Sequence, residues 1–117
     1  MSYIVYGIKN CDTVKKSLTW LKNKNIPFGF HDYKTQGVST DKLKEWCKQK
    51  SWESLVNKKG TTWRQLDDSI KNKITDEASA ILLMKDKTSL IKRPLIEHQG
   101  KIVALGFDEE QYQQLLK

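Results

Sequence analysis

One cysteine of this 117-residue chain stands where a thiol gains reactivity. Cys11 follows the apolar run at residues 3–6 and precedes a segment of helical periodicity that begins at Asp12. A thiol at the start of a helix faces unpaired backbone N–H groups and the positive end of the helix dipole, and both stabilise the thiolate. Lys9 and Lys15 add positive charge, which Asp12 opposes. The alternative is a small packed residue at an element boundary, but packed cysteines more often lie within an element, so position favours a reactive thiol.

The second cysteine is less suited to chemistry. A dithiol mechanism of the C-x-x-C type needs a cysteine at position 14, which is Val14. Cys47 is the other candidate, and it falls on the apolar face of an expected helix beside Leu43 and Trp46, where an inert core thiol is the better interpretation. If Cys11 does redox work, the second electron pair therefore comes from an external thiol.

The chain uses lysine for positive charge almost everywhere and contains only two arginines, Arg64 and Arg93. Arginine offers a rigid, permanently charged fork that binds oxyanions at two points. For Arg64 a surface ion pair with Asp67 or Asp68 is the simpler alternative. Arg93 precedes Pro94 at the start of an expected strand, a position that suits proline because proline cannot sit inside a central strand.

Composition excludes several other classes of function. The net charge of +7 invites a nucleic-acid interpretation, but the lysines are spread evenly, which is typical of a solvated surface. His31 and His98 stand apart from any cysteine or carboxylate cluster, so no metal site is expected. The two cysteines make no disulfide framework, and no apolar run approaches the ~20 residues that span a membrane. We read no signal peptide and expect a soluble cytoplasmic protein.

The pattern of apolar residues predicts elements at both ends of the chain. Residues 3–6 form a strand buried on both faces, residues 12–24 a helix, and Phe28, Phe30 and Tyr33 a second, parallel strand. Residues 95–98 and 101–105 form an antiparallel hairpin around Gln99-Gly100. Asp108 then caps a last helix with Tyr112, Leu115 and Leu116 on its apolar face, and Gln111 completes a capping box.

The middle of the chain is helical. Ser39 or Thr40 caps a first helix, and a short second one with Trp52, Leu55 and Val56 ends near Gly60. We expect a third with Trp63, Leu66 and Ile70 and a fourth, after Thr75, with Ala78, Ile81 and Leu82. At 117 residues this is one domain, residues 1–117. The class is α/β: a thioredoxin-like fold with a helical insertion between an N-terminal βαβ half and a C-terminal ββα half.

Three segments resemble a known family. Residues 6–16 (YGIKNCDTVKK), 62–64 (TWR) and 91–96 (IKRPLI) closely resemble the arsenate reductase (ArsC) superfamily, above all the YffB-like reductases, with the Spx-type regulators as cousins. The resemblance covers essentially the whole chain in the same order. It implies a thioredoxin-like fold and a thiol reaction linked to glutathione or glutaredoxin, with no bound cofactor. In such folds a cis-proline before the third strand lies next to the active cysteine, which implies that Arg93 lies close to Cys11.

The resemblance also assigns roles to residues. Cys11 matches the catalytic cysteine, and Arg64 and Arg93 match arginines that hold an oxyanion or stabilise the thiolate. The implied substrate-binding set is completed by Asn10, Thr13 and Pro94.

The chain departs from its relatives at two places. Arsenate reductases carry a further arginine after the hairpin, where this chain reads ALGFD at residues 104–108, and this argues against arsenate as the substrate. Spx-type regulators often carry C-x-x-C, and Val14 removes that switch.

These observations support three classes of function. In the first, an enzyme, the Cys11 thiolate attacks an oxidised sulfur or an oxyanion, the arginines bind negative charge, and glutathione resolves the adduct. In the second, a Spx-like regulator, the chain docks on RNA polymerase without turnover. The third, direct nucleic-acid binding, rests on net charge alone and is the least favoured.

Overall fold

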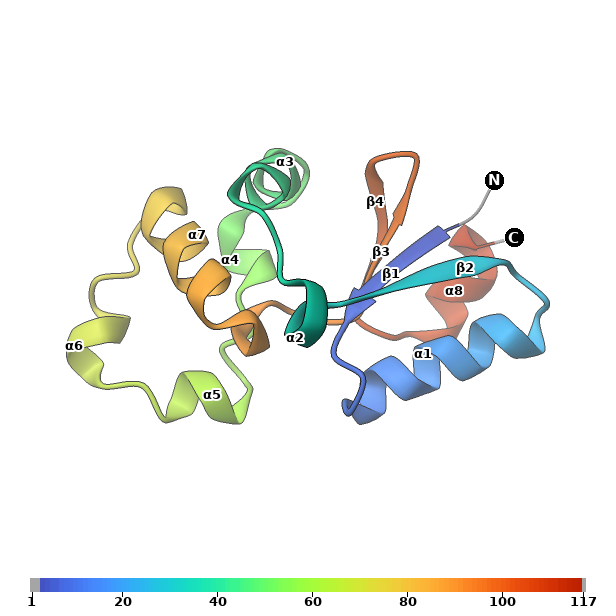
Figure 1. Cartoon of the computed structure of the whole chain (residues 1–117), viewed down its shortest axis with the longest axis horizontal. Coiled ribbons are helices and arrows are strands. Elements are labelled where there is room, and N and C mark those ends of the chain that lie inside the picture. Colours follow the sequence, from blue (N-terminus) through green and yellow to red (C-terminus); the bar gives the residue numbers. More distant parts are fainter. Residues whose placement is uncertain (1–2, 117) are drawn as a thin grey trace. The chain divides into compact units, whose positions relative to one another are not determined.

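The computed structural model describes residues 3–116, which divide into two compact units (Figure 1). The sheet unit comprises residues 3–36 and 93–116, and the helical unit comprises residues 37–92. That the whole chain is one domain stays a prediction. No helix within residues 3–116 is long and apolar enough to cross a membrane.

Four strands form the sheet in the order β2-β1-β3-β4. They are β1 (Tyr3–Gly7), β2 (Phe28–Asp32), β3 (Leu95–His98) and β4 (Lys101–Leu105). β1 and β2 are parallel, whereas β3 is antiparallel to both β1 and β4. The βαβ half, the helical insertion and the ββα half follow in the predicted order, and the thioredoxin-like fold is confirmed.

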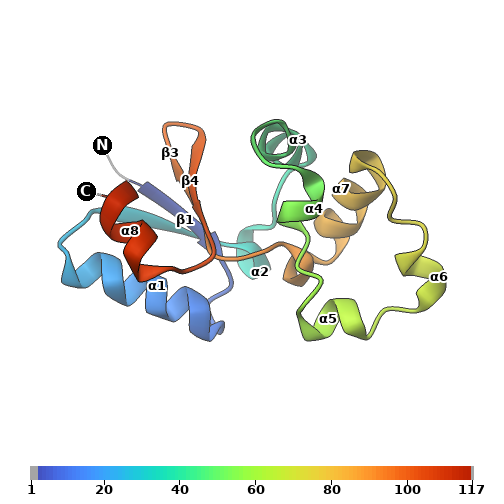
Figure 2. The same ribbon diagram turned by 180° about the vertical axis from the view of Figure 1, so that it is seen from behind.

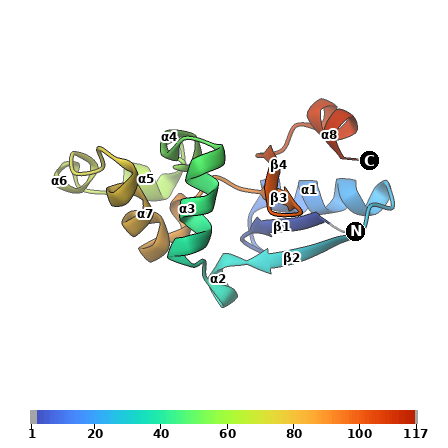
Figure 3. The ribbon, with the colours of Figure 1, turned by 90° about the horizontal axis from the view of Figure 1, so that it is seen from above.

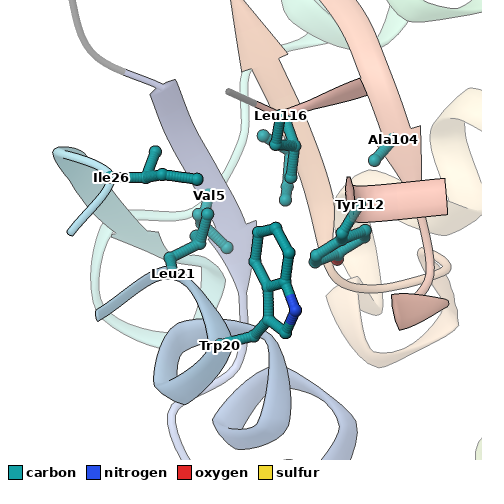
Figure 4. Close-up of a cluster of buried hydrophobic side chains, with 8 residues drawn as sticks. Val5, Trp20, Leu21, Ile26, Ala104, Tyr112 and Leu116 are labelled. Atoms are coloured by element: carbon teal, nitrogen blue, oxygen red, sulfur yellow. The ribbon is translucent and has the colours of Figure 1, made fainter. Parts of the chain in front are cut away.

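Two helices, α1 (Asp12–Asn23) and α8 (Glu109–Leu115), cover the same face of the sheet (Figure 3). Between them and the strands lies the core cluster drawn in Figure 4: Val5, Trp20, Leu21, Ile26, Ile96, Ala104, Tyr112 and Leu116. The rings of Trp20 and Tyr112 meet edge to face at 5.3 Å, a geometry that adds about 0.5–1.5 kcal/mol to their burial. The Tyr112 hydroxyl donates to the Gly106 carbonyl oxygen at 2.7 Å and lies 3.0 Å from Ser17 Oγ, so the polar end of the ring is satisfied within the core.

The hairpin turn and the Asp108 N-cap at the C-terminal end are confirmed, whereas the capping box with Gln111 stays a prediction. Gln99 and Gly100 have φ angles of 54° and 81°, the left-handed pair that a two-residue hairpin turn requires. The Asp108 side chain accepts hydrogen bonds from the backbone N–H groups of Glu110 and Gln111 and caps α8.

The helical unit, seen from behind in Figure 2, contains α3 (Thr40–Gln49), α4 (Trp52–Leu55), α5 (Thr61–Arg64), α6 (Asp68–Lys71), α7 (Glu77–Asp86) and the 3-10 turn η1 (Thr88–Leu90). Ser39 is the residue that caps α3, through its hydroxyl and the Lys42 N–H. Asp76 and Ser79 cap α7 reciprocally. The apolar interior of the unit is formed by Leu43, Trp46, Leu55, Val56, Ala80, Ile81, Met84, Leu90 and Ile91.

Several boundaries differ from the sequence prediction. Ile4 is 40% exposed, so the N-terminal part of β1 is not buried on both faces. Tyr33 does not extend β2 but begins the helical turn α2 (Tyr33–Gln36). The expected third helix is divided into two short helices, α5 and α6. They are separated because the backbone of Asp67 is extended, and aspartate is unfavourable inside a helix. Leu82 and Leu115 are 69% and 51% exposed, because their neighbours occupy the buried faces of α7 and α8.

Candidate active site

The ends of β1 and β2 bring two segments together. These strands are parallel, and their last residues, Gly7 and Asp32, are paired, so both chains leave the sheet at the same end. The connection that carries Cys11 follows β1, and Tyr33 follows β2 directly. Figure 1 shows the β1–α1 connection and α2 at this end of the sheet.

β3 brings a third segment to the same place. It is antiparallel to β1 and pairs Leu95 with Tyr6, so the residues before Leu95 lie beyond the end of β1. Those residues are Arg93 and the buried Pro94, joined by a cis peptide bond, as the resemblance implied. The Pro94 carbonyl oxygen accepts a 2.7 Å hydrogen bond from the Gly106 N–H, which ties this turn to the end of β4.

Cys11 is the N-cap residue of α1 and is half-buried. Its backbone is extended, with φ −99° and ψ 124°, and its carbonyl oxygen accepts the first hydrogen bond of the helix from the Lys15 N–H at 2.9 Å. In this position the side chain lies at the positive end of the helix dipole, beside first-turn N–H groups that have no partner within the helix. The prediction of a cysteine at the helix start is confirmed.

The surroundings of Sγ favour the thiolate. Partial burial raises the pKa of Cys11, but hydrogen bonds from the Val14 N–H and from the Arg93 side chain lower it. The positive charge of Arg93 and the Thr13 N–H act in the same direction, and the pKa lies below its ordinary value. Arg93 is therefore beside Cys11, as expected from the turn that carries it.

Close packing fixes the start of α1. Val14 is fully buried, and a Cβ atom added to Gly7 would lie 2.8 Å from Val14 Cγ2, closer than real contacts allow. Glycine at position 7 therefore lets the first turn of α1 approach the end of β1, and the Val14 N–H is held where it meets Sγ.

Cys47 differs from Cys11 in its electrostatic surroundings. It lies in α3 and is half-buried rather than in the core, which corrects the expected position. Burial, together with the nearby charge of Glu77, raises the pKa of Cys47 to about 11. A thiol with this pKa is almost entirely protonated at neutral pH and is a poor nucleophile.

The remaining predicted residues lie at different places. Arg64 is exposed at the end of α5 in the helical unit, where its carbonyl oxygen accepts a hydrogen bond from Lys71 Nζ at 3.4 Å. Asn10 is exposed in the turn before Cys11, and Thr13 is exposed in the first turn of α1, where it meets Sγ through its backbone N–H. The binding roles of Arg64, Asn10, Thr13 and Pro94 stay predictions.

Sequence reasoning did not find a buried polar group on the sheet. The Tyr6 hydroxyl donates to Glu97 Oε1 at 3.0 Å, and Glu97 is only 2% exposed. Burial raises the pKa of Tyr33, as do Tyr6 and Glu97, whereas Arg93 lowers it. A glutamate inside the apolar run of β3 was the available signal, because a buried carboxylate needs hydrogen-bond partners. Within residues 3–116 no group of three histidine, cysteine or acidic side chains is arranged to hold a metal ion.

Known proteins resemble this chain over nearly its full length. The solved structure of the YFFB protein has a TM-score of 0.91 and 42% identity, covering 99% of this chain and 100% of that one. An arsenate reductase (ArsC) related protein from Brucella melitensis has a TM-score of 0.80 and 43% identity, covering 100% and 96%. An uncharacterised Haemophilus influenzae protein is 47% identical over 109 residues, 93% of this chain and 94% of its own length.

More distant relatives include regulators. The global transcriptional regulator Spx 1 of Lactococcus lactis is 23% identical over 114 residues, which cover 96% of this chain and 87% of the regulator. The model of the ArsC family matches residues 6–115. These residues include the Cys11 connection, Arg64 and the Arg93-Pro94 turn, and the chain belongs to the ArsC family.

Proposed function

We propose that this protein is a thiol reductase whose nucleophile is the thiolate of Cys11, with glutathione or a glutaredoxin as electron donor. The observation that carries the proposal is the pairing of Cys11 with Arg93 at the start of α1. A lowered thiol pKa places more of the nucleophilic form at neutral pH. The fold shared with proteins described as related to arsenate reductase supports the same class of chemistry.

For a disulfide substrate the reaction proceeds in three exchanges. The Cys11 thiolate attacks one sulfur, a mixed disulfide forms, and the other sulfur leaves as a thiolate with the electron pair of the broken bond. One glutathione thiolate attacks the substrate sulfur of this adduct and releases Cys11, and a second glutathione reduces the glutathione–substrate disulfide. Two glutathione molecules thus become one glutathione disulfide. The donor is external because position 14, where a C-x-x-C partner would stand, is Val14.

Arg93 serves the two exchanges in which Cys11 takes part. Its guanidinium stabilises the Cys11 thiolate before attack and after release, and it offers a two-point contact for a carboxylate of glutathione or for an oxyanion. We assign Arg64, Asn10, Thr13 and Pro94 to substrate binding on the strength of the family resemblance. The segment at residues 104–108 lacks arginine, so we do not assign arsenate as the substrate. A cytoplasmic location, where glutathione keeps thiols reduced, fits this reaction.

The decisive experiment is a mass-spectrometric search for the mixed disulfide. The folded protein is incubated with oxidised glutathione and digested without reductant. We expect a glutathione adduct on the peptide containing Cys11, its loss in Cys11→Ser, and its persistence in Cys47→Ser. Modification of Cys47 alone, or of neither cysteine, would contradict the proposal.

A second candidate function is a Spx-like regulator that binds RNA polymerase without turnover. The similarity to Spx 1 over 96% of the chain favours it, whereas Val14 opposes a version switched by a C-x-x-C disulfide. Co-purification with RNA polymerase, unchanged by Cys11→Ser and without turnover of thiol substrates, would support this function over the reductase.

A further inference from the structure

A groove runs along α1 on the side of the helix that faces the start of α8. We call it the α1 groove. Its volume is about 350 Å³, and it is lined on one side by Lys15, Lys16, Thr19 and Trp20 and on the other by Phe107 and Glu109. These residues all belong to the sheet unit, so the groove is formed within one compact unit. A volume of this size is enough for part of a small ligand.

Both sides of the α1 groove begin at the candidate active site. On α1, Lys15 lies one turn after Cys11, and its N–H donates to the Cys11 carbonyl oxygen at 2.9 Å. On the other side, Phe107 follows Gly106, whose N–H donates to the Pro94 carbonyl oxygen at 2.7 Å. A group attached to Sγ of Cys11 therefore reaches the groove by extending along α1 for about one helical turn, roughly 5.4 Å.

The α1 groove combines aromatic surface with positive charge. Phe107 is half-buried, and its ring meets that of Tyr112 edge to face at 5.0 Å, which holds it in one orientation. Aromatic rings favour a second ring as a stacked or edge-to-face neighbour. Lys15 and Lys16 are exposed and contribute two positive charges, against one negative charge from Glu109. The chemistry of the groove therefore suits an aromatic group that carries a carboxylate.

We propose that the α1 groove binds one half of a disulfide substrate, an aromatic ring with a carboxylate, and that Phe107 selects this substrate. The Cys11 thiolate attacks the sulfur of the bound half and forms a new S–S bond with it. The other half leaves as a thiolate with the electron pair of the broken bond. Binding in the groove brings the reacting sulfur to the thiolate and so raises the second-order rate of exchange. This inference rests on the proposed function, because it names the substrate class of the Cys11 reaction.

Three disulfides separate the effect of the ring from that of the charge. Dithiobis(nitrobenzoate) is aromatic and anionic, dithiodipyridine is aromatic and neutral, and hydroxyethyl disulfide is aliphatic and neutral. The rate of adduct formation is followed by mass spectrometry in protein that carries Cys47→Ser, so that Cys11 is its single thiol. Each rate is divided by the rate with iodoacetamide, which reports how much thiolate is present.

Phe107→Ala removes the aromatic side of the groove. We expect the relative rates with both aromatic disulfides to fall about fivefold to tenfold and the rate with hydroxyethyl disulfide to stay unchanged. The matched control is Phe28→Ala, another half-buried phenylalanine on the same core cluster, which pairs with Tyr3 at the opposite end of β1 from Gly7. This control should leave all three relative rates unchanged. An equal effect of Phe107→Ala on the three disulfides, or no effect, would overturn the inference.

A second variant keeps the test informative if Phe107→Ala does not fold. Phe107→Leu retains apolar bulk beside Tyr112 but removes the ring. We expect a loss of about twofold to threefold in the relative rates with the two aromatic disulfides, and no loss with hydroxyethyl disulfide. Unchanged rates with all three disulfides would again contradict a selective role of the ring.

The double variant Lys15→Gln/Lys16→Gln tests the charge. The relative rate with dithiobis(nitrobenzoate) should fall about fivefold, whereas the rate with neutral dithiodipyridine should stay constant. The matched control is Lys22→Gln/Lys101→Gln, which removes the same two charges at exposed positions outside the groove. A similar fall in the control would mean that the net charge of the protein, and not the groove, attracts the anion, and would contradict the inference.

The proposed function and the present inference fail in different ways. The proposed function fails if wild-type Cys11 forms no adduct with glutathione. The inference fails if that adduct forms but the relative rates with the three disulfides do not depend on Phe107.

Discussion

The two cysteines of this protein are buried to a similar degree, yet the pKa values of their thiols are shifted in opposite directions from that of an ordinary cysteine. Cys11 has a lowered pKa, and Cys47 has a pKa raised to about 11. Burial raises the pKa of both thiols. The difference comes from the neighbours, since Cys11 meets backbone N–H donors and the charge of Arg93, whereas Cys47 meets the charge of Glu77. Partners, rather than exposure, decide which thiol is a nucleophile.

The most direct test of this comparison is alkylation of both cysteines in the folded protein near pH 7.5. We expect Cys11 to react on the order of a hundredfold faster than Cys47, because only the thiolate reacts and a thiol with a pKa near 11 is almost fully protonated. Peptide mapping by mass spectrometry gives the two rates. As pH rises, the Cys11 rate should reach its midpoint at a lower pH than an ordinary thiol, while the Cys47 rate should still be rising at pH 10. Equal rates at pH 7.5 would show that the neighbours do not distinguish the thiols.

Arg93→Lys keeps the charge beside Cys11 but removes the fork. We expect about a tenfold or greater loss of glutathione affinity, since a charge-assisted bond contributes about 1.5–3 kcal/mol. The pKa of Cys11 should rise toward its ordinary value because the hydrogen bond from the guanidinium is lost. Calorimetry and a thiolate titration measure the two effects. Lys92→Gln, an exposed neighbour, is the control, and agreement between Arg93→Lys and wild type in both measurements would remove Arg93 from the site.

Gly7→Ala tests whether close packing sets the start of α1. The added Cβ would lie 2.8 Å from Val14 Cγ2, so the helix start must move. We expect a loss of about 1–3 kcal/mol in the free energy of unfolding, with slower alkylation of Cys11. Urea denaturation measures the first effect. Gly29→Ala, in β2, is the matched control because its Cβ would meet nothing within 4 Å. A similar loss of stability in both variants would mean that the contact with Val14 is not the cause.

Of these substitutions, Glu77→Gln is expected to have the smallest effect, and the effect is on the reactivity of Cys47. Removing the negative charge should lower the pKa of Cys47 by a few tenths of a unit, because exposed charges interact weakly through water. Alkylation of Cys47 at pH 9 should become about twofold faster as more thiolate is present. The rate at Cys11 serves as an internal reference and should stay constant. A slower reaction at Cys47 would mean that Glu77 does not oppose its ionisation.

Short-range signals predicted much of the fold. Gln99-Gly100 supplies the left-handed turn that a tight hairpin needs, and the hairpin forms where it was expected. Ser39 and Asp108 cap their helices through their own side chains, so their positions follow from neighbouring residues. Predictions failed where the choice depended on packing, as at Leu82, whose apolar side chain is exposed because Ala80, Ile81 and Met84 occupy the buried face of α7.

The candidate site also combines features that follow from neighbouring residues with features that depend on the fold. The sequence by itself determined that Cys11 stands at a helix start, that Val14 is no second thiol, and that Arg93 precedes a strand with proline at its entrance. These features depend on residues a few positions apart, whose geometry the local backbone limits.

Only the tertiary structure decided which distant side chains meet. The pairing of β3 with β1 brings Arg93 to Cys11 across more than 80 residues of sequence, and the parallel pairing of β2 with β1 brings Tyr33 to the same end of the sheet. The same registers bury Tyr6 against Glu97. Strand register is set by the packing of whole faces against the core, and a shift of one residue in β1 or β3 would turn Tyr6 or Glu97 to the opposite face.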